Sequence, residues 1–397
     1  MKILIATAGS RGDIAPYTGL GAGLLAAGHD VRVAAQEEFA PMVRAAGLGF
    51  RALSAGPRRA PGQGRTLMGS AAAFAADLGR GFEDLLEAGT DLMLLSATTA
   101  PFGPHLTEAT GIPAAGAHLQ PNAPTGAFPP VVAGTRSLGR FGNRLAGRFA
   151  LRMVDRVYAP AVRDLRTRLD LPPAHGPEVR RREERAHRPV LHGFSEALVP
   201  RPADWRPGLE VVGTWWPYLA TRELPPEVED FLAAGPPPVL VSFGSMASGE
   251  GERLSALAVE ALRGAGLRGI LQSGAAGLAA DTDGILTVGD LPHELLLPRT
   301  AGVVHHCGAG TSAAAARAGV PSVPVPVTAD QPFWAGRLHR AGAAVTPIPF
   351  GQLTAARLTA ALRALPEATG AAGVAARMAT EDGATAAVKA VERLMRG

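Results

Sequence analysis

The sequence predicts an α/β protein with two doubly wound parallel sheets, and three observations support this prediction. Short apolar runs at residues 2–6 and 239–243 are each followed by a glycine turn and a helical segment. Further apolar runs alternate with helical segments along both halves, which is the pattern of parallel sheets covered by helices. A proline-rich stretch, residues 214–236, separates the halves and indicates a linker.

Length and composition favour a globular protein of two domains. The 397 residues are 47% hydrophobic, enough to bury two sizeable cores. No run approaches the roughly 18 apolar residues that cross a membrane, and the N-terminus enters a strand without a signal-peptide pattern. The single cysteine, Cys307, excludes an internal disulfide. We therefore expect a cytoplasmic protein without stable membrane insertion.

The charge pattern gives no indication of a nucleic-acid partner. The chain carries 39 basic and 35 acidic residues. The densest basic cluster, residues 180–185, contains Glu183 and Glu184 and no aromatic residue. Nucleic-acid sites usually show a stripe of one charge or aromatic stacking groups. We interpret the cluster as a solvated face and expect no nucleic-acid partner.

The first half opens as a strand, a turn at residues 9–13, a helix and a second strand. Pro16 suits the first turn of that helix. A long helix is predicted over residues 140–169. Residues 57–80 are interpreted as a mobile loop and helix beside a ligand cleft, or as a plain surface excursion. Residues 119–135 are similarly irregular. Strands are predicted at residues 2–6, 30–35, 91–95, 112–115, 189–194 and 209–213.

The second half repeats this order. Its strands are predicted at residues 239–243, 269–272, 285–288, 302–305 and 322–325. The last segment, residues 384–396, places five apolar residues on one helical face: Ala387, Val388, Val391, Leu394 and Met395. We expect this helix to dock by that face.

Residues 305–312 form a glycine-rich turn between the predicted strand 302–305 and a helix of small residues. Thr311 or Ser312 stands near the helix start, and Gly319 suits its end. Such a turn leaves helical N–H groups unbonded and lets a ligand approach the backbone, so a phosphate suits it. A histidine at the strand end can add a donor. An ordinary strand-to-helix turn with a core histidine is the alternative.

Three motifs resemble those of a known enzyme family. Residues 305–311, His-His-Cys-Gly-Ala-Gly-Thr, with residues 330–334, Asp-Gln-Pro-Phe-Trp, resemble the donor signature of family 1 glycosyltransferases. Residues 10–13, Ser-Arg-Gly-Asp, resemble the N-terminal turn of their bacterial antibiotic branch, which glycosylates polyketides and glycopeptides. Further similarity extends this resemblance over nearly the whole chain, at residues 195–205, 212–215 and 241–245.

The resemblance implies the GT-B fold, in which two Rossmann-like domains face one another and the C-terminal helix crosses back to the first. Residues 1–213 would bind the acceptor, 214–236 would link the domains, 237–380 would bind the nucleotide sugar, and 381–397 would form the returning helix. The implied reaction moves a sugar, a deoxysugar rather than plain glucose, from a TDP- or UDP-sugar co-substrate to a small lipophilic acceptor such as a polyketide or glycopeptide aglycone. No separate cofactor and no metal are expected.

Chemistry and resemblance together suggest a donor site. His306 and the backbone of the glycine turn would hold the diphosphate, with Ser245 adding a hydroxyl. Asp330 and Gln331 would bind sugar hydroxyls, and residues 288–293 would clasp the base. The expected donor-binding residues are Ser10, Arg11, Gly12, Ser245, Leu291, His293, His306, Gly308, Ala309, Gly310, Thr311, Asp330 and Gln331.

Asp13 is the candidate general base. Many members of the family carry histidine in this turn, whereas the antibiotic branch carries aspartate, as here. An ionised carboxylate can take the proton of an acceptor hydroxyl as its oxygen attacks the anomeric carbon opposite the nucleotide, which would invert the configuration. In the alternative, Asp13 only caps the helix starting near Pro16, as asparagine or serine would. The two roles are compatible because a carboxylate has two oxygens.

The acceptor pocket is expected among irregular segments of the first domain, with Phe74, Phe82, His118, Phe128 and Met153 as candidates.

Asp281 and Asp283 have the spacing of a metal site, but they lie in a predicted turn far in sequence from the glycine turn. We interpret Cys307, which stands where bacterial relatives usually carry glycine, as a small packing residue.

Two other function classes remain open. Two Rossmann-like halves and the acidic Glu37 and Glu38 after the second strand would suit an NAD(P)-dependent oxidoreductase, although the first turn lacks the expected glycine spacing. A non-catalytic nucleotide-binding helper of a glycosyltransferase is the other class. Asp13, His306 and the Asp330 and Gln331 pair argue against a helper, which has no chemical need for a base.

Overall fold

The computed structural model describes residues 1–53, 67–82, 85, 89–244 and 249–396. The first half forms a seven-stranded sheet in the order β3-β2-β1-β4-β5-β6-β7, in which all paired strands are parallel. Its strands are β1 (Lys2–Ala6), β2 (Asp30–Ala35), β3 (Gly49–Ala52), β4 (Leu92–Leu95), β5 (Ala114–His118), β6 (Val190–His192) and β7 (Leu209–Val211).

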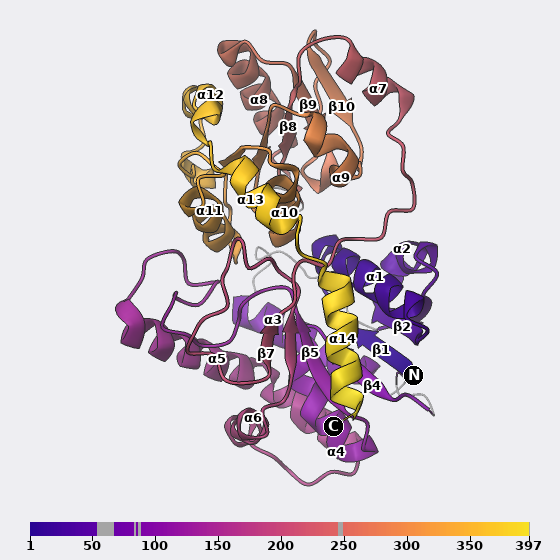
Figure 1. The fold of residues 1–397 in the computed structure, drawn as a ribbon. Helices are drawn as coiled ribbons and strands as arrows, with labels where there is room; N and C mark the ends of the chain where they lie inside the picture. The colour runs from indigo at the N-terminus through magenta and orange to yellow at the C-terminus, as the bar shows by residue number, and fades with distance from the viewer. Residues whose placement is uncertain (54–66, 83–84, 86–88, 245–248, 397) are drawn as a thin grey trace.

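The second half forms a five-stranded parallel sheet in the order β10-β9-β8-β11-β12. The two sheets belong to two domains that lie one above the other in Figure 1. The strands of the second domain are β8 (Val239–Ser242), β9 (Gly269–Gln272), β10 (Ile285–Val288), β11 (Gly302–His305) and β12 (Ser322–Pro324).

Helices cover both faces of the first sheet because its strands are apolar on both sides. Ile3 and Ile5 pack with α1 on one face, whereas Leu4 and Ala6 pack with α3 and α5 on the other. The helices of this domain are α1 (Arg11–Ala26), α2 (Ala40–Ala45), α3 (Leu67–Gly81), α4 (Gly103–Thr110), α5 (Gly139–Arg168) and α6 (Gly176–Arg185). The later helices are α7 (Pro226–Ala233), α8 (Gly251–Ala265), α9 (His293–Leu296), α10 (Ala309–Ala318), α11 (Gln331–Arg340), α12 (Ala355–Arg363), α13 (Ala371–Met378) and α14 (Gly383–Arg396).

The C-terminal helix α14 returns to the first domain, where Figure 1 shows it lying against the N-terminal sheet. Ala387, Ala390 and Val391 of α14 are buried in the same core as Ile3 and Ile5 of β1. Of the expected docking face, Ala387 and Val391 are buried and Val388 and Leu394 are partly buried, whereas Met395 near the end of the helix is exposed.

A further apolar core joins the two domains. Phe128 of the first domain packs edge-on against Phe333 of α11, with ring centroids 5.3 Å apart. Phe194 of the first domain likewise meets Trp334 of α11 at 6.2 Å. These side chains share a buried cluster with Trp205. The domains are consequently held together at one side of the space between them.

Three local expectations differ from the structure. Helix α1 begins at Arg11 instead of near Pro16, so Asp13 lies in the first helical turn. Helix α7 lies inside the predicted linker, and its Val228 and Leu232 are buried in the core of the second domain. Strand β3 was missed because residues 49–52 are mostly exposed and carry no apolar run. Over the described residues, no helix combines the length and apolarity needed to span a membrane.

Candidate active site

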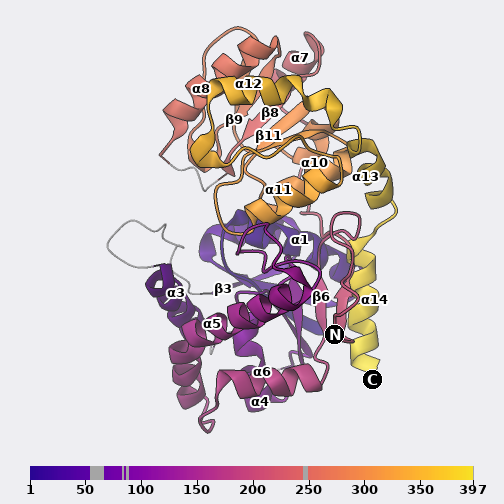
Figure 2. The same cartoon turned by 90° about the vertical axis from the view of Figure 1, so that its left-hand side faces the viewer.

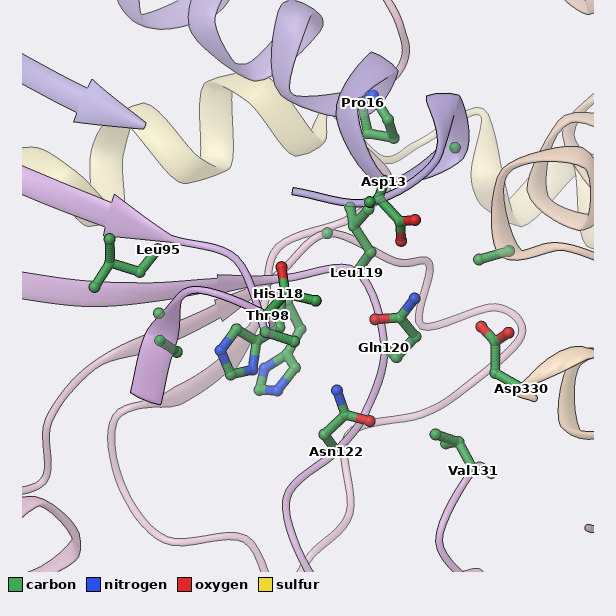
Figure 3. A pocket seen from close by; sticks show the side chains of 18 of the residues that line it. Asp13, Pro16, Leu95, Thr98, His118, Leu119, Gln120, Asn122, Val131 and Asp330 are labelled. Atoms are coloured by element: carbon green, nitrogen blue, oxygen red, sulfur yellow. The ribbon is translucent and has the colours of Figure 1, made fainter. Parts of the chain in front are cut away.

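A cleft between the domains collects the ends of strands from both sheets. Residues that follow β1, β4 and β5 line one wall, and residues that follow β8, β10 and β11 line the other. Ligands in open parallel sheets bind beyond the carboxyl ends of the strands. Figure 3 shows Asp13, His118, Gln120 and Asn122 of the first domain around one part of this space, with Asp330 of the second domain opposite.

Asp13 is held by one carboxylate oxygen. Its Oδ2 accepts hydrogen bonds from the backbone N–H of Ser10, at 2.8 Å, and from the Ser10 hydroxyl, at 2.9 Å. These bonds tie Asp13 to Ser10, the residue that precedes α1. Within the described part of the chain, Oδ1 has no hydrogen-bond partner. Asp13 therefore caps its helix with one oxygen and presents the other to the cleft.

Gly9 and Gln36 hold the turn that carries Asp13. The Gln36 side chain accepts a hydrogen bond from the Gly9 N–H, at 3.2 Å, and donates one to the Gly9 carbonyl, at 2.9 Å. Gly9 has φ +149°, and a Cβ at this position would lie 2.4 Å from Oδ2 of Asp13. Glycine is required here because the carboxylate occupies the space of its side chain.

Asp330 and Gln331 are partly engaged within the protein. Oδ2 of Asp330 accepts a hydrogen bond from the Trp334 indole at 2.9 Å. Burial raises the pKa of Asp330, against the opposing effect of hydrogen bonds from Trp334 and Gln120. Oε1 of Gln331 accepts from the backbone N–H groups of Val327 and Thr328, at 2.8 and 3.1 Å. Only the amide nitrogen of Gln331 is left for a ligand.

The second glycine turn surrounds the ring of His306. A Cβ on Gly244 would lie 2.6 Å from Cε1 of His306, and a Cβ on Gly308 would lie 2.7 Å from its Nε2. The next residue, Cys307, has φ +63°, which glycine adopts without the cost that a side chain incurs. Cys307 is fully buried, and burial raises the pKa of its thiol. This supports a packing role and leaves no nucleophile there.

Three buried polar atoms of this turn have no partner in the described structure. They are Nε2 of His305, Nδ1 of His306 and Oγ of Ser312. Burial lowers the pKa of both histidines, that of His305 to about 3, so the rings are neutral near pH 7. Buried polar atoms are nearly always hydrogen-bonded in folded proteins. These three atoms lie at the strand end and the first turn of α10, while other buried polar atoms without a partner, such as those of Trp215 and Ser322, lie elsewhere in the described chain.

The remaining expected donor residues also lie along the cleft. Nε2 of His293, at the start of α9, lies 3.0 Å from Oε1 of Gln272. Burial lowers the pKa of His293 to about 4. Leu291 lines the same wall. Arg11 lies 3.4 Å from Asp290 of the second domain, so it forms an exposed ion pair across the cleft. Gly12, Ala309, Gly310 and Thr311 are close by along the two turns, whereas Ser245 lies outside the described residues.

Three of the five acceptor candidates line the cleft and two do not. Phe74, His118 and Met153 contribute to its walls. Phe82 is fully buried against Phe102, with centroids 5.1 Å apart. Phe128 is buried in the core between the domains, where the Arg337 guanidinium lies 4.7 Å from its ring centre. We drop Phe82 and Phe128 because their rings are used for packing.

Gln36, Gln120, Asn122 and Thr98 are cleft residues that the sequence did not single out. Gln120 and Asn122 follow β5 directly, and Thr98 follows β4. Their position at the carboxyl ends of predicted strands was the available signal. Asp281 and Asp283 do not line this cleft, and the Arg263 guanidinium donates to the hydroxyl of Thr282 between them.

Comparisons with known proteins agree with this geometry. Residues 271–394 match the C-terminal domain of the family described as erythromycin biosynthesis protein CIII-like. Residues 3–87 match the N-terminal domain of glycosyltransferase family 28. Among solved structures, the glycosyltransferase of kitacinnamycin is similar with a TM-score of 0.74 at 20% identity, covering 99% of each chain. The calicheamicin glycosyltransferase CalG4 is similar with a TM-score of 0.72 at 19% identity, covering 99% of this chain and 97% of that one. The GT-B fold is thereby confirmed.

Relatives at higher identity extend the agreement from fold to family. The O-mycaminosyltylonolide 6-deoxyallosyltransferase of Streptomyces fradiae is 38% identical over 91% of this chain and 89% of its own length. The glycosyltransferase GtfE of Amycolatopsis orientalis is 32% identical over 98% of this chain and 96% of its own length. These matches overturn the oxidoreductase alternative. The chain belongs to the glycosyltransferases of antibiotic biosynthesis.

Proposed function

We propose that this enzyme transfers a deoxysugar from a TDP- or UDP-sugar to a hydroxyl of a small lipophilic acceptor with inversion, using Asp13 as the general base. The observation that carries the proposal is the position of Asp13. One carboxylate oxygen is bound by Ser10, while the other enters the cleft opposite Asp330. Capping the helix uses only Oδ2 of Asp13, so it gives no reason for a second oxygen that faces the cleft.

In the proposed step one proton is transferred, one bond to the anomeric carbon forms and one breaks. The acceptor hydroxyl gives its proton to Oδ1 of Asp13 as its oxygen forms a bond to the anomeric carbon. The bond from that carbon to the diphosphate oxygen breaks, and its electron pair leaves with the nucleoside diphosphate. Because Asp13 and the glycine turn belong to opposite walls, the acceptor attacks from the face opposite the leaving group, and the configuration inverts.

The glycine turn is the proposed site of the leaving diphosphate. The N-terminus of α10 supplies unbonded N–H groups and the positive end of the helix dipole. The unpaired atoms of His306 and Ser312 can add donors without placing a charge, since His306 is neutral near pH 7. The Arg11 and Asp290 pair is exposed, so Arg11 can exchange its carboxylate partner for a phosphate at small cost.

Asp330 and Gln331 are the proposed contacts to the sugar. Asp330 accepts hydrogen bonds from Trp334 and Gln120, and its two carboxylate oxygens have further lone pairs to accept sugar hydroxyls. Gln331 has its amide nitrogen available as a donor. Residues 288–293, with Leu291 and His293, are the proposed contacts to the base. Two structural neighbours, SsfS6 and SpnG, are described as complexed with thymidine diphosphate, which supports a TDP-sugar donor.

The acceptor is proposed to occupy the first-domain part of the cleft. Phe74, His118 and Met153 provide apolar and aromatic surface there, and Gln120 and Asn122 provide polar groups. A relative named for O-mycaminosyltylonolide supports a macrocyclic polyketide acceptor. Plant sterol 3-beta-glucosyltransferases, 31% identical over 99% of this chain in one case, also support a lipophilic molecule with a hydroxyl.

Thermal unfolding with TDP, UDP or NAD, each with magnesium or with chelator, tests the donor proposal. A ligand at 100 times its Kd adds about 2.7 kcal/mol to the free energy of unfolding. We expect TDP or UDP to raise the Tm equally with magnesium or chelator, and the His306→Ala variant to lose most of the rise. A rise that requires magnesium, or that persists in His306→Ala, contradicts the proposed site.

Turnover by the isolated chain separates an enzyme from a helper. With a TDP-deoxysugar and a panel of macrolactone acceptors, we expect release of TDP and an inverted glycoside by NMR. TDP binding without turnover under any acceptor, together with an unchanged result in Asp13→Asn, would favour the non-catalytic helper.

A further inference from the structure

The outer face of helix α5 exposes a row of large apolar side chains. Phe141, Leu145 and Phe149 are 83%, 55% and 61% exposed. Leu138 and Val132, in the segment leading into the helix, are 59% and 65% exposed. We call these five residues the α5 stripe. Surfaces of monomeric proteins rarely carry such contiguous apolar patches without a partner.

The spacing of the stripe follows the helix. Phe141, Leu145 and Phe149 are four residues apart, so they project along one line of the helix surface. The opposite side of α5 is buried, including Asn143 and Gly147. Figure 2 shows α5 running across the side of the first domain that faces the viewer, below α11. The helix is therefore anchored by one side and presents the stripe to its surroundings.

Arginines surround and continue the stripe. Six exposed arginines have no carboxylate partner within the described ranges: Arg136, Arg140, Arg148, Arg152, Arg156 and Arg163. Neighbouring arginines that do have partners show the contrast, since Arg144 pairs with Asp204 and Arg180 with Asp155. The face thus combines exposed phenylalanine and leucine with uncompensated positive charge.

We propose that the α5 stripe docks the enzyme on an anionic lipid surface. A helix that places Phe and Leu beside an arginine-rich polar face lies in the interface of a membrane, with its apolar side chains among the acyl chains and its arginines at the phosphates. The long arginine stems reach past the apolar row to the headgroups. A second copy of this chain fits less well, because a symmetric contact would bring the two sets of unpaired arginines together.

The docked helix would also border the cleft. Met153 of α5 contributes to the cleft wall, so the lipid-facing helix lies at the edge of the space proposed for the acceptor. A lipophilic acceptor dissolved in the bilayer would then reach the cleft without crossing much water. Docking itself does not depend on the proposed reaction, and its test does not use activity.

Sedimentation of the full chain with lipid vesicles tests the docking. We expect binding to vesicles of phosphatidylglycerol and phosphatidylcholine in equal parts, and at least about tenfold weaker binding to pure phosphatidylcholine. Raising the salt concentration to 1 M shortens the screening length to about 3 Å and should weaken the anionic binding by a similar factor. Equal binding to both vesicle types, or no binding to either, overturns the proposal.

Variants on and off the stripe locate the contact. Phe141→Ser with Phe149→Ser, and separately Arg148→Gln with Arg152→Gln, are each expected to weaken binding to anionic vesicles by about tenfold or more. The matched controls are Leu25→Ser, at an exposed apolar position of α1, and Arg253→Gln with Arg299→Gln on the second domain. Retained Tm values and an unchanged TDP-induced Tm rise show that the stripe variants are folded. Equal loss in the controls overturns the location.

Two further outcomes would assign the stripe to another occupant. A dimer in analytical ultracentrifugation that Phe141→Ser converts to a monomer would place a second copy on the stripe. Binding to soluble poly-glutamate but not to anionic vesicles would indicate an acidic protein surface. Either result overturns docking on lipid.

Discussion

The two glycine turns of this enzyme differ in how their polar groups are satisfied. In the first turn, residues 7–13, the polar groups have partners within the protein. Ser10 donates hydrogen bonds to Asp13, and the Gln36 side chain bonds the backbone of Gly9. The second turn, residues 305–312, leaves His305, His306 and Ser312 with buried polar atoms that have no partner in the described structure. Both turns follow an interior strand of a parallel sheet and precede a helix.

This difference suggests different tasks for turns of the same topology. A general base works best when its position is set before the substrate arrives, and hydrogen bonds within the turn provide that order. A phosphate site must leave its donors open, at a cost in stability that the ligand recovers on binding. The comparison therefore predicts that the first turn controls kcat and the second controls donor affinity.

Replacing Asp13 with Asn should have the largest effect. Asparagine keeps a side-chain oxygen for Ser10, so the cap is maintained, but it cannot accept a proton from the acceptor. We expect kcat to fall by about 10²- to 10⁴-fold, with an unchanged TDP-induced rise in Tm. Steady-state kinetics and thermal shift measure the two quantities. Full activity in Asp13→Asn would leave Asp13 as a helix cap only.

Gly9→Ala should displace the base without removing it. The added Cβ would lie 2.4 Å from Oδ2 of Asp13, so the carboxylate must move. We expect kcat to fall by about 10- to 100-fold, the order of a misplacement of about 1 Å, while TDP affinity stays. Gly111→Ala is the matched control, because Gly111 also has positive φ, at +74°, but a Cβ there meets nothing within 4 Å. An equal loss of kcat in Gly111→Ala would show that backbone strain, and not displacement of Asp13, causes the loss in Gly9→Ala.

Gly308→Ala should give the opposite result in the second turn. Its Cβ would lie 2.7 Å from Nε2 of His306 and would displace the ring. We expect Kd for TDP to rise by about tenfold, equivalent to one hydrogen bond to a charged group, as measured by calorimetry. At saturating donor, kcat should change less than in Gly9→Ala. A larger loss of kcat than of affinity would undo the division of tasks between the turns.

Lowering the pH should destabilise the second turn, because it holds the buried His305. Burial lowers the pKa of His305 to about 3, below the unfolded value of about 6.5. Its contribution to stability is present above pH 6.5 and is lost as the pH falls toward 3, by up to roughly 1.4 kcal/mol per pH unit. Urea unfolding between pH 7 and 5 should show a smaller slope in His305→Asn than in the wild type. Equal slopes would exclude His305 as a source of the acid sensitivity.

The sequence by itself determined the two-sheet α/β architecture, because buried parallel strands are apolar runs and glycine turns precede helices within a few residues. It also indicated Asp13, the glycine turn at 305–311 and the docking face of the last helix, since these are patterns of neighbouring residues. The start of the first helix was predicted wrongly, since the helix was expected near Pro16 and begins at Arg11, with Asp13 in its first turn.

Only the tertiary structure decided which distant residues meet. Gln36 follows β2, yet it holds Gly9 after β1 because those strands are paired. Phe128 was expected at the acceptor but packs between the domains, and Gln120 meets Asp330 from the other sheet. Such contacts depend on strand order, domain packing and the competition of each side chain for buried space. None of these leaves a periodic signal in the chain, which is why local patterns predicted the turns but not their partners.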